Sequence, residues 1–374
     1  MDREHKLLQQ LAHDFAQTEI AAVIDESEET GIYPDEIWEK CGRYGFAGAC
    51  IPKEYGGQGA DNFAAVLILE EFTRVQVSAA SLLMGNSLSG MPILKCGTEE
   101  QKQKYLRPLA EGKMKVSFAL TEPGAGSDTS AILTTAVPDG DNFILNGTKT
   151  FITLGPVCDT AVVFAKVPDE TGKGRMTAFI VENGWKGFSK GKPEKKMGMH
   201  ASATCDLIFE DVVVPKENVL GRVGGGWAVA QSGLCAGRII VAAQALGGAQ
   251  GCIDEAIKYA GERVQFGRPI GKFQNTRFKV ADMIARLEAG RQLLYSASHS
   301  YDAGEDALLQ ASMAKYYLSE TANEIAAKCV QIHGGYGYMQ DFAVERFYRD
   351  LRLLPLFEGT SEVQLMVISS AMMK

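Results

Sequence analysis

The stretch best suited to acid–base chemistry is residues 356–362 (Leu-Phe-Glu-Gly-Thr-Ser-Glu). Its carboxylate, Glu358, follows apolar residues and precedes Gly359, whose missing Cβ lets another group approach the backbone closely. Thr360 is a suitable N-cap for a helix that begins after it. Burial among apolar side chains would raise the pKa of Glu358 toward the range in which a carboxylate acts as a general base. The alternative is that Glu358 is an exposed residue before a helix, and this stretch alone favours that simpler interpretation.

A glycine-rich turn follows a predicted strand at residues 118–128 (Phe-Ala-Leu-Thr-Glu-Pro-Gly-Ala-Gly-Ser-Asp). Its backbone N–H groups and the Ser127 hydroxyl could bind an anion such as a diphosphate, and the Thr121 hydroxyl could meet a heteroaromatic edge. It is not a Walker loop, because the G-K-[ST] ending is missing, and no βαβ unit surrounds it as a dinucleotide fingerprint requires. An ordinary glycine and proline turn explains the same residues equally well.

A second strand end, residues 149–153 (Lys-Thr-Phe-Ile-Thr), places an aromatic ring and a hydroxyl two positions apart. Alternate residues of a strand share one face, so Phe151 could stack on a flat ring while Thr153 hydrogen-bonds to it. Without further support, the simpler interpretation is a hairpin strand with a core phenylalanine.

Two later segments suggest contact with a ligand or another subunit. Residues 263–274 gather cations beside glycines, and the planar fork of arginine binds two phosphate oxygens at once, although a solvated loop is an equal alternative. Residues 331–338 (Gln-Ile-His-Gly-Gly-Tyr-Gly-Tyr) end a predicted helix with more glycines than a cap needs. We expect His333 to be structural rather than a ligand.

The overall composition excludes several classes of function. The chain has 374 residues, of which 46% are hydrophobic and 22% charged, as is typical of a globular protein with two or three domains. Its net charge of −8 argues against nucleic acid as a partner. The 8 cysteines are scattered without C-x-x-C spacing, so neither a metal site nor a disulfide framework is expected, and a cytoplasmic location fits best. No signal core and no uninterrupted apolar run long enough for a membrane span is visible.

The pattern of the chain is α, then β, then α, which predicts an α+β fold. We expect an N-terminal all-α domain at residues 1–114, a middle β-barrel-like domain at 115–221 and a C-terminal four-helix bundle at 222–374. Residues 98–101 (Thr-Glu-Glu-Gln) form a capping box in the first domain. Short segments rich in β-branched and aromatic residues mark the second, and long segments with helical periodicity mark the third.

Taken together, these motifs resemble the acyl-CoA dehydrogenase family across essentially the whole chain. The resemblance rests on residues 121–128, 263–267, 331–337 and 358–360 in this order. Residues 85–88 (Gly-Asn-Ser-Leu) and 91–93 (Met-Pro-Ile) look most like the short- and medium-chain branch of bacterial type.

The resemblance implies that an acyl-CoA binds with its thioester between Glu358 and the flavin of FAD. Glu358 would abstract the α-proton while the β-hydrogen leaves as hydride to flavin N5, giving a trans-2-enoyl-CoA. Because the α C–H is a very weak acid, the thioester oxygen needs hydrogen bonds as in an oxyanion hole. In this family they come from the backbone N–H of the base and from an FAD ribityl hydroxyl. Electrons then pass to an electron-transferring flavoprotein, and FAD shared between subunits implies a homotetramer.

Residues of this sequence that match the family's motifs are implied to have the family's binding roles. The positions implied for FAD are Phe118, Leu120, Thr121, Ser127, Phe151, Thr153, Arg263, Phe266, Gln274, Gln331, Gly334, Gly335, Thr360 and Glu362. The positions implied for acyl-CoA are Ser127, Arg238, Gly359 and, near the pocket floor, Met84, whose apolar side chain suits an uncharged acyl tail.

Three departures from the family pattern bear on this assignment. Some branches carry the base just before the arginine of the first bundle helix, but here Gly237 occupies that position, which favours Glu358 as the base. Cys235 stands where an acidic residue often contacts CoA, so that contact is in doubt. Phe151 replaces a common tryptophan, which keeps stacking but loses the indole N–H.

Two alternative functions remain open on the same scaffold. The enzyme could run in reverse as an enoyl-CoA reductase, which the sequence does not exclude. A non-catalytic acyl-CoA- or flavin-binding protein should have lost the base, and the presence of Glu358 with its flanking residues speaks against it. An oxidase of the same superfamily would usually be a much longer chain.

Overall fold

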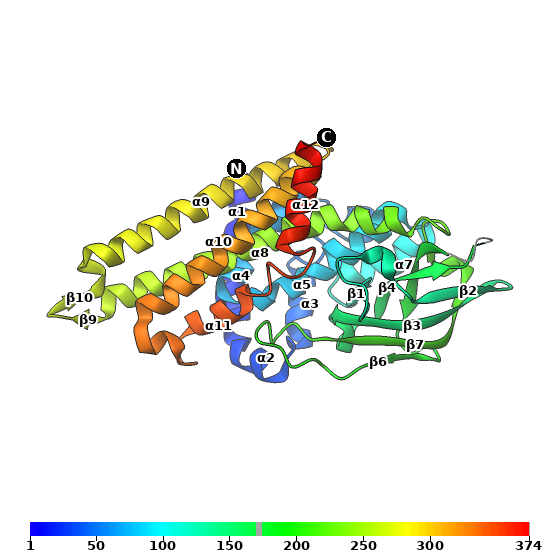
Figure 1. Cartoon of the computed structure of the whole chain (residues 1–374), viewed down its shortest axis with the longest axis horizontal. Coiled ribbons are helices and arrows are strands. Elements are labelled where there is room, and N and C mark those ends of the chain that lie inside the picture. Colours follow the sequence, from blue (N-terminus) through cyan, green and yellow to red (C-terminus); the bar gives the residue numbers. More distant parts are fainter. Residues whose placement is uncertain (170–173, 374) are drawn as a thin grey trace.

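The computed structural model describes residues 1–169 and 174–373, without the side chains of Asn86 and Ser87. The side chains of these two residues, part of the predicted short- and medium-chain motif, therefore lie outside the described part. The chain folds in the predicted order of a helical part, a β-sheet part and a second helical part (Figure 1).

The N-terminal part consists of short and medium helices. They are α1 (Arg3–Phe15), α2 (Ile24–Thr30), α3 (Asp35–Arg43), α4 (Asn62–Val75), α5 (Ser81–Met84), α6 (Met91–Cys96) and α7 (Glu99–Ala110). The predicted capping box is present at the start of α7, where Thr98 accepts from the Gln101 N–H and the Gln101 side chain accepts from the Thr98 N–H. The reciprocal bonds satisfy donors that a helix start otherwise leaves unpaired.

In the described residues of the middle part, eight strands form a sheet in the order β6-β7-β3-β2-β4-β5-β8, with β1 paired to β4. Its strands are β1 (Val116–Ala119), β2 (Thr135–Asp139), β3 (Asn142–Thr153), β4 (Thr160–Val167), β5 (Arg175–Glu182), β6 (Phe188–Lys190), β7 (Thr204–Pro215) and β8 (Val219–Leu220). Strand β1 runs parallel to β4, whereas β3 runs antiparallel to β7. The sheet thus brings the ends of β1 and β3 into one neighbourhood.

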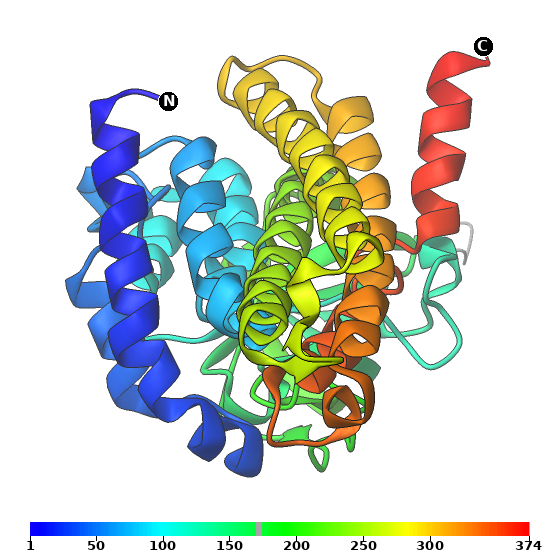
Figure 2. The same ribbon diagram turned by 90° about the vertical axis from the view of Figure 1, so that its left-hand side faces the viewer.

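Long helices dominate the C-terminal part. They are α8 (Gly226–Glu262), α9 (Gln274–Asp302), α10 (Leu308–His333), α11 (Ala343–Leu351) and α12 (Ser361–Met372), and a hairpin of β9 (Val264–Gln265) and β10 (Arg268–Pro269) joins α8 to α9. Figure 2 shows α1 on one flank and α12 on the other, with the long helices between them. Buried side chains of α4, α8 and α10 belong to one core, so the two helical parts pack together.

Among the residues that the structure describes, two helical segments are long and apolar enough to cross a membrane by length and composition alone. They are Val77–Cys96 and Gly226–Glu262, and the apolar windows that qualify them are 88% and 78% buried inside the protein. Neither segment is an uninterrupted apolar run, so the sequence pattern predicts neither as a span. Core helices of a soluble protein meet the same criterion, so these segments are weak support for a span.

A buried acid ties the end of the helical bundle to the segment that leads into β7. Asp350 on α11 is fully buried, and its Oδ1 accepts the Met199 N–H at 2.5 Å. The second carboxylate oxygen has no hydrogen-bond partner in the described chain. Burial, together with the negative charge of Glu28, raises the pKa of Asp350 to about 7, although the Met199 N–H opposes the shift.

We expect Asp350→Asn to stabilise the protein above neutral pH. In the parent protein, the folded state holds the Asp350 proton more tightly than the unfolded chain does. Protonated Asp350 therefore contributes its full stability below about pH 4, and this contribution is lost as the pH rises through about 7, whereas the neutral asparagine is unaffected. Each unit of raised pKa corresponds to about 1.4 kcal/mol. Thermal unfolding from pH 5 to 8 should show a growing advantage of the variant. A variant less stable than the parent at pH 8 would contradict this account.

Candidate active site

Glu358 lies in the turn between α11 and α12, with its carboxylate close to α8. Its Oε2 is 3.4 Å from the position that a Cβ on Gly237 would occupy, and Leu88 is nearer still to that position. Within the described chain, the carboxylate itself makes no hydrogen bond, and the residue is half-buried. A side chain at position 237 would therefore compete with Glu358 and Leu88 for the same space.

Burial and nearby positive charges act in opposite directions on the pKa of Glu358. Burial raises the pKa of this carboxyl to about 6, whereas the charges of Lys315 on α10 and Arg238 on α8 act in the opposite direction. Arg238 is itself buried, and its Nε has no hydrogen-bond partner in the described residues. A carboxylate with this pKa is ionised at neutral pH yet remains basic enough to take up a proton. The unpaired donor of Arg238 is one that a bound ligand could satisfy.

Two consecutive left-handed residues form the turn that carries the carboxylate. The φ angles are 53° at Glu358 and 85° at Gly359. For a residue with a Cβ this conformation costs about 1–3 kcal/mol and persists only where the surroundings hold it. Here the Gln364 amide donates to the Glu358 and Gly359 carbonyl oxygens at 3.2 and 2.9 Å, and Lys315 Nζ donates to the latter at 2.7 Å. Thr360 caps α12, as the sequence predicts.

Sequence reasoning missed Lys315 and Gln364. A signal for Lys315 was available, since it interrupts a face of α10 that is otherwise apolar and buried, with Ala311, Leu318 and Ala322 on it. A lysine in such a row is rarely buried unless it has a partner. The partner could not be read from the sequence, because it is a backbone carbonyl 44 positions away.

The residues implied for the flavin half of FAD come together at the ends of β1 and β3. The Thr150 N–H donates to the Thr121 carbonyl oxygen at 2.9 Å, and Ser117 Oγ donates to the Thr153 carbonyl oxygen at 2.8 Å. Phe151 is 68% exposed and has a left-handed φ of 57°. Within the described chain, the Thr121 and Thr153 hydroxyls make no hydrogen bond. An exposed ring beside unpaired hydroxyls fits a flat heteroaromatic partner.

A buried ion pair fixes the glycine-rich turn beside this group. Lys149 is fully buried, and its Nζ donates to Glu122 Oε1 at 2.7 Å and to the Leu120 carbonyl oxygen at 3.0 Å. Glu122 also accepts from the Leu133 and Thr134 N–H groups at 2.5 and 3.0 Å. A buried pair whose members are fully hydrogen-bonded holds its segment in one conformation. The pair thereby positions the turn that ends at the exposed Ser127.

A second group of predicted residues gathers around the β9–β10 hairpin. The Arg263 guanidinium lies 5.3 Å from the ring centroid of Tyr336, in the glycine-rich segment after α10, so the two segments are neighbours. Phe266 at the hairpin is 94% exposed and has a left-handed φ of 50°. Gln331, Gly334 and Gly335 are exposed nearby in the chain, and Gln274 begins α9.

His333, in the same segment, has a structural environment. Its ring stacks on Tyr259 with centroids 4.2 Å apart, and its Nδ1 bonds to the Cys329 carbonyl oxygen at 2.8 Å. Burial lowers the pKa of His333. The expectation of a structural histidine is thus confirmed.

The two groups of predicted FAD residues lie apart in one protomer. Figure 1 shows the β9–β10 hairpin at one end of the long helices and the sheet at the other. Of the other predicted residues, Glu362 is exposed in the first turn of α12, and Met84 is buried at the end of α5. A single chain therefore does not bring all the predicted FAD contacts together.

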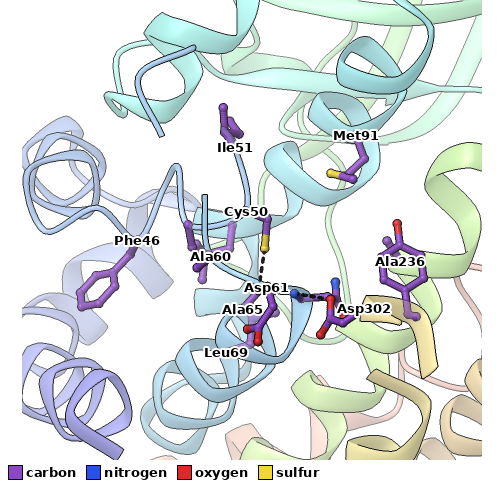
Figure 3. A pocket seen from close by; sticks show the side chains of 14 residues that line it. Phe46, Cys50, Ile51, Ala60, Asp61, Ala65, Leu69, Met91, Ala236 and Asp302 are labelled. Atoms are coloured by element: carbon purple, nitrogen blue, oxygen red, sulfur yellow. Dashed lines mark hydrogen bonds between the residues drawn. The ribbon is translucent and has the colours of Figure 1, made fainter. Parts of the chain in front are cut away.

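A cavity of about 140 Å³ lies between the N-terminal helices, α8 and the end of α9, and Glu358 is not among the residues that line it. Figure 3 shows Phe46, Met91 and Ala236 on its walls, with Asp61 and Asp302 at its polar side. Two of its lining residues precede residues of the candidate site in the chain: Ala236 precedes Gly237, and Leu83 precedes Met84. The cavity shares α8 with the site but contains none of the residues predicted for FAD or acyl-CoA.

Comparison with known proteins identifies the family. Family models for the N-terminal, middle and C-terminal domains of acyl-CoA dehydrogenases match residues 2–113, 117–212 and 224–373. A caffeyl-CoA reductase–Etf complex subunit of Acetobacterium woodii is 51% identical over 99% of this chain and 98% of that protein. A 3-(aryl)acrylate reductase of Clostridium sporogenes is 50% identical over 99% of both.

A solved structure agrees with the sequence comparison. Butyryl-CoA dehydrogenase of Megasphaera elsdenii superposes with a TM-score of 0.96 and 41% identity, covering 100% of this chain and 99% of that one. Matches of this extent confirm the predicted three-part fold. The chain belongs to the acyl-CoA dehydrogenase family.

Proposed function

We propose that the protein is an FAD-dependent oxidoreductase that interconverts an acyl-CoA and its 2-enoyl-CoA, with Glu358 handling the α-proton. The observation that carries the proposal is the position of the Glu358 carboxylate beside Gly237 and Arg238, with burial raising its pKa to about 6. At this pKa the group can accept a proton in one direction and return it in the other.

The chain's own residues divide the work as follows. Glu358 holds or removes the α-proton at its carboxylate, and its backbone N–H donates toward the thioester oxygen, where charge develops. Arg238, buried with an unpaired Nε, orients the acyl-CoA beside the base. Phe151, Thr121 and Thr153 offer a stacking face and hydroxyls to the flavin ring. When bound, FAD supplies the hydride acceptor or donor for the β-carbon.

FAD shared between subunits explains the separation of its predicted contacts. The residues near β1 and β3 would hold the flavin half, and those near the β9–β10 hairpin would hold the diphosphate and adenosine of a neighbouring subunit's FAD. Arginine and exposed aromatic side chains suit both parts of that ligand. This arrangement supports a homotetramer in which each site needs residues from more than one chain.

The physiological direction we propose is reduction of an enoyl-CoA, in place of the dehydrogenation expected from the sequence. Two relatives at 51% and 50% identity are named as reductases, and one of them is a subunit of a complex with Etf. These names favour an electron-transferring flavoprotein as the electron donor. Dehydrogenation remains the second candidate, favoured by the likeness to butyryl-CoA dehydrogenase.

The acyl tail we propose is uncharged and includes an aryl group. Met84 is buried, and its flexible thioether can pack against an aromatic ring. The two reductases are named for caffeyl-CoA and aryl acrylate. A tail that carries a carboxylate would find no positive charge at Met84 to pair with.

Anaerobic stopped-flow spectroscopy in both directions tests direction and substrate together. The reduced holoenzyme is mixed with an arylacrylyl-CoA or crotonyl-CoA, and the oxidised holoenzyme with the matching saturated thioesters. We expect the arylacrylyl-CoA to oxidise the reduced flavin fastest, by about tenfold or more over crotonyl-CoA. A higher rate with butyryl-CoA on the oxidised enzyme than with any enoyl-CoA on the reduced one would instead support the dehydrogenase.

A further inference from the structure

The ammonium group of Lys315 is unusual because it is buried without an ion pair. The side chain is fully buried on α10, and within the described residues no carboxylate lies within 4 Å of its Nζ. Its recorded hydrogen bond goes to the Gly359 carbonyl oxygen at 2.7 Å. A charge removed from water in this way is retained only where it serves the surrounding structure or chemistry.

This hydrogen bond ends on the strained turn that carries the base. Glu358 and Gly359 are both left-handed, and Gln364 donates to both of their carbonyl oxygens. Lys315 on α10 and Gln364 on α12 thus both hydrogen-bond to the backbone of the same turn. Without them the turn could relax toward ordinary φ angles, and the carboxylate would leave its place beside α8.

We propose that Lys315 is a positioning residue for Glu358: its hydrogen bond to Gly359 holds the left-handed turn, and its buried charge acts on the Glu358 carboxylate. The inference rests on the proposed role of Glu358 as the group that takes up and returns the α-proton. It assigns to Lys315 two effects that can be separated, one on the geometry of the turn and one on the affinity of Glu358 for protons.

Charged groups on three helices bear on this proton affinity. Arg238 on α8 and Lys315 on α10 lower the pKa of Glu358. Burial lowers the pKa of Lys315 to about 8, and the charge of Arg238 acts in the same direction. The charges of Glu358, of Glu320 on α10 and of Glu362 on α12 act in the opposite direction. Lys315 is therefore mainly charged at neutral pH, and its charge is the first of the two that oppose the effect of burial on Glu358.

The test measures the rate at which a saturated acyl-CoA bleaches the oxidised flavin of the holoenzyme as a function of pH. In this direction Glu358 must be ionised to accept the α-proton. Lys315→Met removes the charge and the hydrogen bond. We expect the midpoint of the profile to rise by about one pH unit, which alone lowers the rate roughly fivefold near pH 6. Gln364→Leu loosens the turn without changing any charge, so its rate should fall while the midpoint stays. Lys315→Arg retains the charge and should restore the parental midpoint.

An unchanged midpoint in Lys315→Met would overturn the proposal, as would an equal shift in Gln364→Leu. If Lys315→Met does not fold, the midpoint is measured in Lys315→Gln, which is neutral but keeps a hydrogen-bond donor near Gly359. The same rise of the midpoint is expected. Failure of the proposed function looks different: the parental holoenzyme would then show no absorbance change with any thioester. An active parent whose neutral variants keep its profile contradicts only the role of Lys315.

Discussion

Glu358→Gln should bind FAD and acyl-CoA normally and lose nearly all thioester-dependent change in flavin absorbance. The amide has the shape of the carboxylate but cannot accept the α-proton, and a positioned base contributes about 10²- to 10⁴-fold to the rate. Because the carboxylate makes no hydrogen bond within the described chain, the substitution breaks none there. We therefore expect the fold and the flavin spectrum to be retained.

The matched control is Glu39→Gln, the same substitution at an exposed position on α3. It should keep the parental rate. Rapid-mixing absorbance measures the rate, and equilibrium titration with a thioester measures binding. If Glu358→Gln retained a rate within a few-fold of the parent, the proton acceptor would have to be another group.

Arg263→Ala should weaken the hold on FAD and the association of subunits. Arg263 lies against Tyr336, so its loss removes both a candidate phosphate ligand and a contact between the hairpin and the segment after α10. A hydrogen bond to a charged group contributes about 1.5–3 kcal/mol, so FAD affinity should fall roughly tenfold or more. The flavin content after gel filtration and the sedimentation coefficient report the two effects.

Arg43→Ala, at an exposed site at the end of α3, controls for the loss of a surface arginine and should change neither property. Full flavin content in Arg263→Ala, with the parental state of association, would refute the sharing of FAD between subunits. Loss of flavin without dissociation would place Arg263 at the cofactor alone.

Local features of the fold could be predicted because their causes are local. The Thr98 capping box and the Thr360 N-cap depend on side chains within a turn of each other, and both are present. Strand β2 shows where a local signal is overridden. Pro138 and Asp139 favour a turn, yet the whole strand pairs with β3, and its pairing with β4 is at Thr135, away from the proline.

The candidate site was predictable only in part. The apolar residues before Glu358 left a tuned carboxylate as the less favoured of two interpretations, and only the resemblance to the family selected it; the pKa of Glu358 is indeed raised. The contacts that hold its turn come from Lys315 and Gln364, and the first of these depends on how α10 packs. A sequence shows which side chains are unusual for their helix face, but not which distant carbonyl they will reach.

The most direct test of the central claim is the visible spectrum of the purified protein, followed during anaerobic addition of acyl-CoA and enoyl-CoA thioesters. We predict a yellow protein whose oxidised-flavin absorbance falls with a saturated acyl-CoA and whose reduced form is reoxidised by the matching 2-enoyl-CoA. A colourless protein, or a flavin spectrum that no thioester changes in either direction, would contradict it.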